Sequence, residues 1–220
     1  MRVRPHLIIR SERRSIALSV ALDATIVVRA PKNLPIEVIS RFVASHSSWL
    51  GRKVKEVLAR PVMRPRQFVD GEEILYLGRR FALQIFDGVR IQLKDKLFFP
   101  QNLLPSARAQ LIIWYQRQAR ELIVGSVERW AAKLGFKYVE VKISGALHRW
   151  GSCSRAGNLN FSWRLMMAPS EMIDYVIVHE LTHLVEKNHS KRFWARVRAA
   201  LPDYKKRHQW LKDNDHLLKI

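Results

Sequence analysis

The sequence predicts an α+β fold, in which a β-rich front half over residues 1–100 precedes a mostly helical back half over residues 101–220. In the front half, short runs of β-branched and aromatic residues alternate with turn residues, which is typical of strands. In the back half, apolar residues recur at helical spacing over longer stretches. A chain of 220 residues is long enough for one sizeable core, so we expect a single domain over residues 1–220.

The front half is expected to form short strands and one helix. The helix is expected over residues 36–58, where Ile36, Ile39 and Val43 begin an apolar pattern of helical period. Turn segments at residues 78–80 and 94–96 lie between apolar runs and indicate two hairpins. The expected strands are 15–20, 25–29, 74–77, 81–86, 89–93 and 97–99.

The back half is expected to form helices and two strands. A long helix should end at Gly135, because glycine adopts the left-handed conformation that ends helices. Another should begin with Ser170 as its N-cap, and Pro202 should separate the last two. The expected elements are helices 106–134, 170–187, 190–201 and 203–215 and strands 137–143 and 158–165, these strands being joined by the polar segment 150–157.

The composition limits the class of protein and its partners. The chain carries 39 Lys and Arg against 19 Asp and Glu, a formal net charge of +20, which favours anionic partners. The single cysteine, Cys153, excludes an internal disulfide and a Cys-rich zinc site and fits a reducing compartment. Neither a secretory signal nor a run of ~18 apolar residues is found. These features predict a cytoplasmic protein with no membrane segment.

The segment that carries chemistry is His179-Glu180-Leu181-Thr182-His183, inside the helix expected from Ser170. Four residues make about 400° of helix, so the two histidines lie on nearly the same face. Two imidazoles so placed can bind one Zn²⁺ at ~2.0–2.1 Å. Glu180 can then reach a water molecule beside the ion and act as general base. The alternative is a buried helix whose histidines only form hydrogen bonds.

A zinc site needs a third ligand, and the sequence favours His189. On a continuous helix His189 would point about 240° away from His183, so the helix must end first. Asn188 tolerates the left-handed conformation that ends helices, and Ser190 can cap the next helix. The competing candidates are Glu186, Asp203, His208 and His216.

These segments resemble the YgjP-like metallopeptidase family, which is related to the SprT and WLM zincins. The matching segments are His179–His183, Asn188-His189-Ser190, Phe193-Trp194 and Arg149-Trp150-Gly151-Ser152-Cys153. The resemblance is strongest over residues 149–194. It implies a zincin-like core, with an active-site helix against a small sheet, zinc on His179, His183 and His189, and a catalytic Glu180. Peptide hydrolysis is the activity it favours, and nucleotide pyrophosphatase activity has also been ascribed to members.

Residues outside the motif are weaker candidates for binding substrate. By resemblance, strand 158–165, with Asn160 on its polar face, should lie along a peptide substrate that adds a strand to its edge; an ordinary half-buried strand is the alternative. Arg149 and Arg164 are candidates for anchoring a carboxylate or phosphate, although solvated surface arginines are more common. Cys153 is expected to be a free structural thiol and not a nucleophile.

The basic segment 187–212 is a candidate for binding nucleic acid. It holds nine basic residues, one acid and several aromatic residues, a composition found on nucleic-acid surfaces. The aromatic residues fall at helical spacing, however, which favours core packing beneath a solvated basic face. We therefore expect a zinc-dependent peptidase; the alternatives are a metal-dependent nucleoside triphosphate pyrophosphatase and a DNA-associated, SprT-like protease. With one cysteine, the chain has no zinc ribbon to support the last of these.

Overall fold

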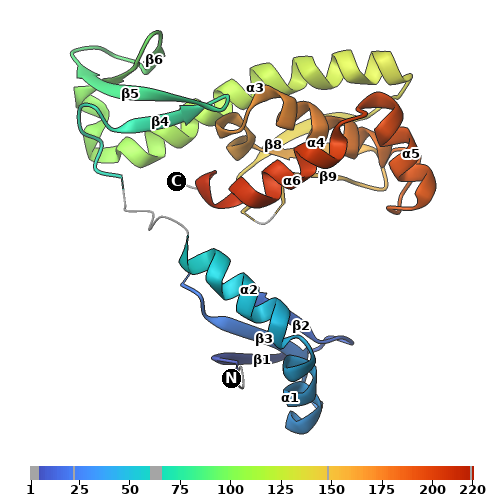
Figure 1. Cartoon of the computed structure of the whole chain (residues 1–220). Helices are drawn as coiled ribbons and strands as arrows, with labels where there is room; N and C mark the ends of the chain where they lie inside the picture. The colour runs from blue at the N-terminus through green and yellow to red at the C-terminus, as the bar shows by residue number, and fades with distance from the viewer. Residues whose placement is uncertain (1–4, 22, 60–65, 148, 219) are drawn as a thin grey trace. The chain divides into compact units, whose positions relative to one another are not determined.

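The computed structural model describes residues 5–21, 23–59, 66–147, 149–218 and 220, and Figure 1 shows their helices and strands. The chain divides into two compact units, Met1–Arg64 and Pro65–Ile220. The first unit combines helices with one small sheet and the second combines helices with two, which confirms the α+β class. No helix among the described residues is long and apolar enough to cross a membrane. A single functional domain over residues 1–220, with a β-rich half over residues 1–100 and a catalytic half over residues 101–220, stays a prediction.

The first unit is a three-stranded sheet with two helices. Its strands are β1 (Leu7–Ser11), β2 (Ala17–Val20) and β3 (Ile26–Pro31), in the order β1-β3-β2, with β1 parallel and β2 antiparallel to β3. Its helices are α1 (Ile36–Ser45) and α2 (Ser47–Leu58). The small core joins Ile26, Val28 and Ala30 of β3 to Ile39, Val43 and Leu50 of the helices.

The prediction of one helix over residues 36–58 is wrong, because the helix is interrupted at His46, between α1 and α2. The Phe42 carbonyl accepts a hydrogen bond from the Ser45 hydroxyl at 2.9 Å, and Nδ1 of His46 lies 2.8 Å from the same oxygen. The His46 amide instead donates to Val43, three residues back. Local side chains thus occupy the carbonyl that a continuing helix would use.

The second unit begins with a four-stranded sheet. Its strands are β4 (Glu73–Tyr76), β5 (Arg79–Phe86), β6 (Gln92–Leu93) and β7 (Leu97–Pro100), in the order β4-β5-β7-β6. Both predicted hairpins are confirmed. The first turns at Leu77-Gly78, whose φ angles of 47° and 76° suit a two-residue hairpin turn. The Leu77 amide donates to the Met166 carbonyl at 2.7 Å, so the turn supports the segment that leads into the helix that begins at Ser170.

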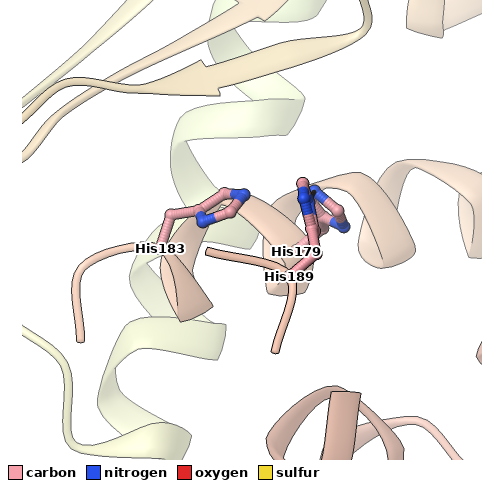
Figure 2. Close-up of side chains that lie close together, drawn as sticks. All are labelled: His179, His183 and His189. Atoms are coloured by element: carbon pink, nitrogen blue, oxygen red, sulfur yellow. Dashed lines mark hydrogen bonds between the residues drawn. The ribbon is translucent and has the colours of Figure 1, made fainter. Parts of the chain in front are cut away.

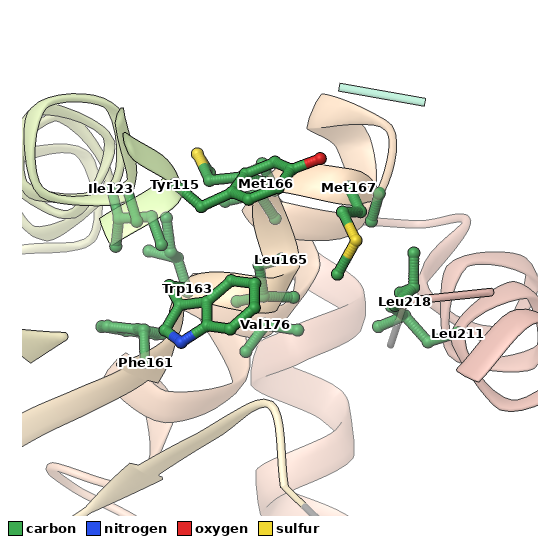
Figure 3. Packing of buried hydrophobic residues seen from close by; sticks show 14 of the residues in the cluster. Tyr115, Ile123, Phe161, Trp163, Leu165, Met166, Met167, Val176, Leu211 and Leu218 are labelled. Carbon is green, nitrogen blue, oxygen red and sulfur yellow. The ribbon is translucent and has the colours of Figure 1, made fainter. Parts of the chain in front are cut away.

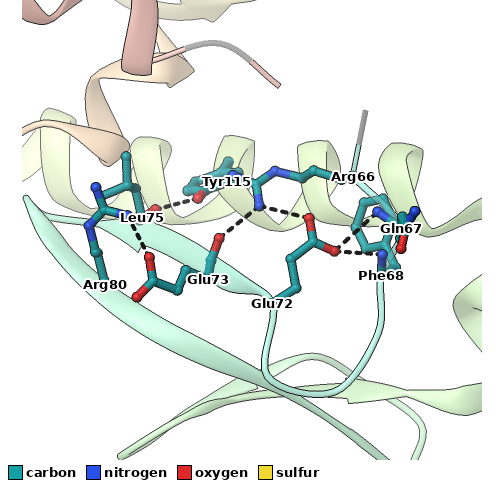
Figure 4. A network of polar contacts seen from close by, with 8 residues as sticks. All are labelled: Arg66, Gln67, Phe68, Glu72, Glu73, Leu75, Arg80 and Tyr115. Atoms are coloured by element: carbon teal, nitrogen blue, oxygen red, sulfur yellow. Dashed lines mark hydrogen bonds and ion pairs between the residues drawn. The ribbon is translucent and has the colours of Figure 1, made fainter. Parts of the chain in front are cut away.

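Polar contacts attach the start of this sheet to the rest of the unit (Figure 4). The Glu72 carboxylate accepts from the amides of Gln67 and Phe68 at 3.2 and 2.6 Å. The Tyr115 hydroxyl, from the long helix, donates to the Leu75 carbonyl in β4. Burial raises the pKa of Tyr115 well above its usual range, which keeps the hydroxyl a donor. The sheet is therefore fixed to the helix by a side chain as well as by packing.

The helix α3 (Ala107–Leu134) follows the 3-10 helix η1 (Gln101–Ser106) and runs the length of the second unit. It ends at Gly135 with φ of 69°, as predicted. Figure 3 shows the core that it helps to form. The Tyr115 ring stacks on Trp163 at 5.6 Å and 20°, and Ile123, Phe161 and Val176 are buried with them. This core packs the segments around Trp163 and Val176 against α3.

The second sheet of the unit contains β8 (Glu140–Ser144), β9 (Gly151–Cys153) and β10 (Asn158–Ser162), in the order β8-β10-β9. Two predictions here are wrong. The polar segment 150–157 is not only a connection, because β9 pairs antiparallel with β10. The strand predicted over 158–165 ends at Ser162 and continues as the 3-10 helix η2 (Trp163–Met167). Since β10 is paired on both sides, the edge strands of this sheet are β8 and β9.

Three helices complete the chain: α4 (Ser170–Thr182), α5 (Lys191–Ala200) and α6 (Tyr204–Asn214), followed by the 3-10 helix η3 (Asp215–Leu217). Helix α4 lies against β9 and α3, so the predicted active-site helix packs against a small sheet. The predicted cap of the next helix is confirmed, since the Ser190 hydroxyl accepts from the Phe193 amide at 3.3 Å. The predicted break at Pro202 is also confirmed.

The predicted ends of α4 need correction. Its first residue is Ser170, so the N-cap is Pro169, and it ends at Thr182 instead of near Lys187. The Thr182 hydroxyl donates to the Val178 carbonyl at 2.7 Å, a bond that bends helices. Beyond it, the amide of His183 bonds three residues back, to Glu180, in a tighter turn. The chain therefore leaves the helix at His183, the second motif histidine.

Candidate metal centre

Three histidine side chains meet at the end of α4 (Figure 2). His179 lies in the last turn of α4, His183 is its C-cap, and His189 belongs to the segment before α5. One ring nitrogen from each lies within 4.8 Å of the other two. The Nε2 atoms of His179 and His189 are 3.0 Å apart. Nitrogens bound tetrahedrally to one Zn²⁺ at ~2.0–2.1 Å are about 3.3–3.4 Å apart, so the set fits a shared ion.

The hydrogen bond of His183 determines which of its nitrogens is available. Its Nδ1 lies 2.9 Å from the backbone carbonyl oxygen of Glu186. A carbonyl oxygen only accepts, so we assign the proton to Nδ1. The lone pair is then on Nε2, which is free to bind a metal. A backbone carbonyl that orients a ligating imidazole in this way is usual in metal sites.

The surroundings of His179 and His183 favour uncharged imidazoles, the form that binds a metal. Burial lowers the pKa of His179 to about 3, and the charges of His183, His189 and His208 act in the same direction. Burial also lowers the pKa of His183. Nδ1 of His179 is buried without a hydrogen-bond partner among the described residues. His179 and His183 are therefore neutral nitrogen donors in a partly desolvated place.

Aromatic rings contact all three histidines. The Phe193 ring centroid lies 4.9, 4.6 and 4.7 Å from those of His179, His183 and His189. The Trp194 ring stacks on His189 at 5.5 Å and 24°, and Tyr204 stacks on Trp194 at 5.3 Å and 21°. His189 is exposed and lies outside the helices, so this stack supplies the support that a helix would give.

The other candidates for the third ligand contact residues outside the histidine cluster. The Glu186 carboxylate is 3.7 Å from Nε of Arg196, and Asp203 accepts from Arg207 at 3.0 Å. The His208 ring centroid lies 6.0 Å from that of Tyr175. Among the described residues, His179, His183 and His189 are the only three His, Cys, Asp or Glu side chains whose ligand atoms lie close enough together to hold one metal ion. His208 and His216 do not belong to this group. The predicted helix stop at Asn188 is wrong, because the turn that returns His189 already begins at His183.

Glu180 is a buried carboxylate that follows His179 in the last turn of α4. It is 6% exposed, and burial raises its pKa to about 7, against the opposing charge of Arg149. Gly151 of β9 lies against it: a Cβ on Gly151 would be 2.6 Å from Cγ of Glu180. A carboxyl group with a pKa near neutrality can take up and return a proton during a reaction at neutral pH.

The sequence did not reveal that β9 is the open edge beside Glu180. The Ser162 amide donates to the Trp150 carbonyl, and the Ser154 amide to Asn158, each at 2.9 Å. Backbone groups alternate in an antiparallel pair, so those of Gly151 and Cys153 point away from β10. No strand in the described ranges pairs with this side of β9. An extended peptide can add there as a further strand. The expectation that β10 has this role is wrong, because both of its edges are occupied.

The remaining candidates differ in how close they lie to Glu180. Arg149 is exposed, two residues before Gly151, and its charge acts on Glu180. Arg164 is 8% exposed and donates from Nη1 to the Gly145 carbonyl at 2.8 Å, which gives it a role in holding the segment before β9. Asn160 points to the sheet face opposite Phe161 and Gly151, away from Glu180. Substrate binding by these three residues stays a prediction.

Two smaller expectations agree with the structure. Burial raises the pKa of the Cys153 thiol, so it is a poor thiolate nucleophile, and its Sγ donates to the Ser154 carbonyl at 3.4 Å. In segment 187–212, Phe193 and Tyr204 are buried and the two tryptophans pack against the core. Those aromatic rings are therefore core residues, as their helical spacing indicates.

Comparison with known proteins shows the family of the chain. The family model of the YgjP-like metallopeptidase domain matches residues 14–214. The chain is similar to the crystal structure of the metallopeptidase zymogen of Pyrococcus abyssi abylysin, at 21% identity and a TM-score of 0.38, over 41% of this chain and 93% of that one. It is also similar to the metallopeptidase zymogen of Methanocaldococcus jannaschii jannalysin, at 20% identity and a TM-score of 0.37, over 40% and 92%. No curated protein matches. With a family model that covers most of its length, the chain belongs to the YgjP-like metallopeptidases, enzymes that act with a metal ion on peptide or protein substrates.

Proposed function

We propose that this protein is a zinc-dependent peptidase in which His179, His183 and His189 hold the ion and Glu180 is the general base. The observation that carries the proposal is the meeting of three imidazole nitrogens at the end of α4, where the residue next to His179 is the buried Glu180. Three imidazole nitrogen donors suit tetrahedral Zn²⁺, whereas Mg²⁺ and Ca²⁺ prefer oxygen donors. A zinc ion there would lower the pKa of a water molecule and polarise the scissile carbonyl.

The residues of the chain do the rest of the chemistry. The open edge of β9 binds the peptide in an extended form through the backbone groups of Gly151 and Cys153. A Glu180 carboxylate oxygen accepts a proton from the attacking water, whose oxygen forms a bond to the carbonyl carbon. As the carbon–nitrogen bond breaks, Glu180 returns that proton to the leaving amine. A pKa near neutrality suits a group that must both accept and give the proton.

Other partners and the location in the cell follow from charge and composition. Weak, salt-sensitive binding of nucleic acid by the lysines and arginines of segment 187–212 is proposed on charge alone. Its aromatic rings are in the core, so binding through stacked bases is not part of this proposal. A cytoplasmic location stays a prediction.

The test is a substrate screen with the purified, zinc-loaded full-length protein. It is incubated with peptide libraries and, separately, with nucleoside triphosphates, and the Glu180→Gln variant is the control for contaminating enzymes. The proposal expects peptide cleavage by the wild type that is absent from the variant. Cleavage of nucleotides alone, lost in the variant, would instead assign the site to pyrophosphatase chemistry.

A further inference from the structure

Two exposed cations flank the proposed catalytic residues. Arg149 stands just before β9, two residues from the glycine that touches Glu180, and its charge acts on that carboxyl group. Lys187 follows Glu186, whose carbonyl contacts the His183 ring, and its charge acts on both His183 and Cys153. Lys187 therefore lies close to the end of α4 and close to β9. One cation belongs to each of the two chain segments that border the site.

The segment that carries Lys187 is held beside the sheet. A Cβ on Gly157, in the turn between β9 and β10, would lie 3.5 Å from Cδ2 of Leu184. The chain between His183 and α5 thus passes next to the β9–β10 turn. This contact places the segment beside the end of the β9–β10 hairpin, and the charge of Lys187 acts on Cys153, the last residue of β9.

Apart from Glu180 itself, no carboxylate among the described residues is seen to act on these two cations. Residues 145–157 contain no Asp or Glu, and residues 184–200 contain only Glu186. Glu186 forms an ion pair with Arg196 at 3.7 Å. Among the described residues, neither Arg149 nor Lys187 forms an ion pair. The border of the site is therefore positive, and its charge is available to a ligand.

We propose that the site selects peptides with acidic side chains next to the scissile bond, and that Arg149 and Lys187 determine this specificity. The inference rests on the proposed peptidase function and names its substrate class. Successive residues of an extended peptide are ~3.3 Å apart, so side chains on either side of the scissile bond come within reach of long basic side chains. Exposed ion pairs are weak, so we expect a preference of about 2- to 5-fold for each cation.

The first test measures binding apart from catalysis. Three fluorescein-labelled decapeptides that alternate Ala with Asp, Asn or Lys are titrated against the full-length, zinc-loaded Glu180→Gln protein at low and high salt. The Asp peptide should bind tightest at low salt and lose its advantage at high salt. Adding Lys187→Gln or Arg149→Gln should each lower the Asp-to-Asn affinity ratio by about 2- to 5-fold. The matched control, Arg90→Gln, changes an exposed arginine between β5 and β6 and should leave the ratio unchanged.

The second test measures catalysis with a peptide that the screen shows to be cleaved, made with Asp, Asn or Lys on either side of the scissile bond. We expect kcat/KM to be highest for Asp, and Lys187→Glu to remove or reverse the order. Equal kcat/KM values for the Asp and Asn peptides would overturn the inference while leaving the peptidase function intact. So would an Asp-to-Asn ratio that changes neither in the Lys187 variants nor in Arg149→Gln. If Lys187→Gln and Arg149→Gln weaken ATP binding but leave the Asp-to-Asn affinity ratio of the peptides unchanged, the cations bind a nucleotide and the inference is also overturned. Absence of all peptide cleavage would contradict the proposed function, and the binding ratios would still decide the inference.

Discussion

Gly151 and Glu180 are in direct contact: a Cβ added to the glycine would lie 2.6 Å from Cγ and 2.8 Å from Oε1 of the glutamate. Real Cβ atoms do not approach other atoms so closely, so the backbone of β9 comes this near only because residue 151 has no side chain. The contact brings the edge strand and the carboxyl group together. The strand that would hold a peptide is therefore positioned against the group that would move the proton.

Replacing Gly151 by Ala should displace the Glu180 carboxyl group without removing the metal ligands. Misplacement of a reacting group by about 1 Å can reduce turnover by ~10²-fold, and we expect a loss of that order. The measurements are kcat and zinc content. The matched control is Gly125→Ala in α3, where the nearest atom to the new Cβ is Nη1 of Arg129 at 3.6 Å. Unchanged turnover in Gly151→Ala would show that this contact does not position Glu180.

Replacing His189 by Ala should weaken zinc binding by at least ~100-fold, beyond the range usual for the loss of an outer hydrogen-bond partner. The reason is that Nε2 of His189 lies 3.0 Å from Nε2 of His179. Competition with a chelator of known affinity gives the dissociation constant. His208→Ala and His216→Ala, the matched controls, should bind zinc normally. The reverse pattern would move the third ligand downstream.

Replacing Trp194 by Ala should lower zinc affinity by about 10- to 100-fold, although the tryptophan is not a ligand. Its ring stacks on His189 and is itself stacked on Tyr204, so its loss frees the histidine to rotate. Trp194→Phe keeps an aromatic face and should restore most of the affinity. Thermal unfolding of the zinc-free proteins separates this effect from general destabilisation. Equal affinity in the Ala variant and the wild type would contradict a positioning role.

Local signals in the sequence were sufficient for several parts of the structure. The end of α3 at Gly135, the cap at Ser190 and the break at Pro202 each depend on one residue and its neighbours. The spacing of His179 and His183 likewise follows from helix geometry. These features could be predicted because the interactions that determine them lie within a few residues.

Features that depend on distant contacts could not be predicted in this way. Gly151-Ser152-Cys153 has little preference for a strand, and it becomes β9 because β10 pairs with it. The early end of α4 had a local signal, the Thr182 side chain, but a threonine inside a helix pattern does not by itself end a helix. The side-chain bonds that break the helix at His46 are of the same kind. The open edge of the sheet was missed for these reasons.

The most direct test of the account is the Glu180→Gln variant, measured for zinc content and for peptide turnover in the same preparation. Glutamine has nearly the same shape but cannot accept the proton of water. We predict about one zinc per chain, as in the wild type, from a site of three histidines. Turnover should fall by ~10²–10⁴-fold, the usual contribution of a general base. Loss of zinc from the variant would make Glu180 a ligand, and full turnover with zinc present would exclude it as the base; either result contradicts the account.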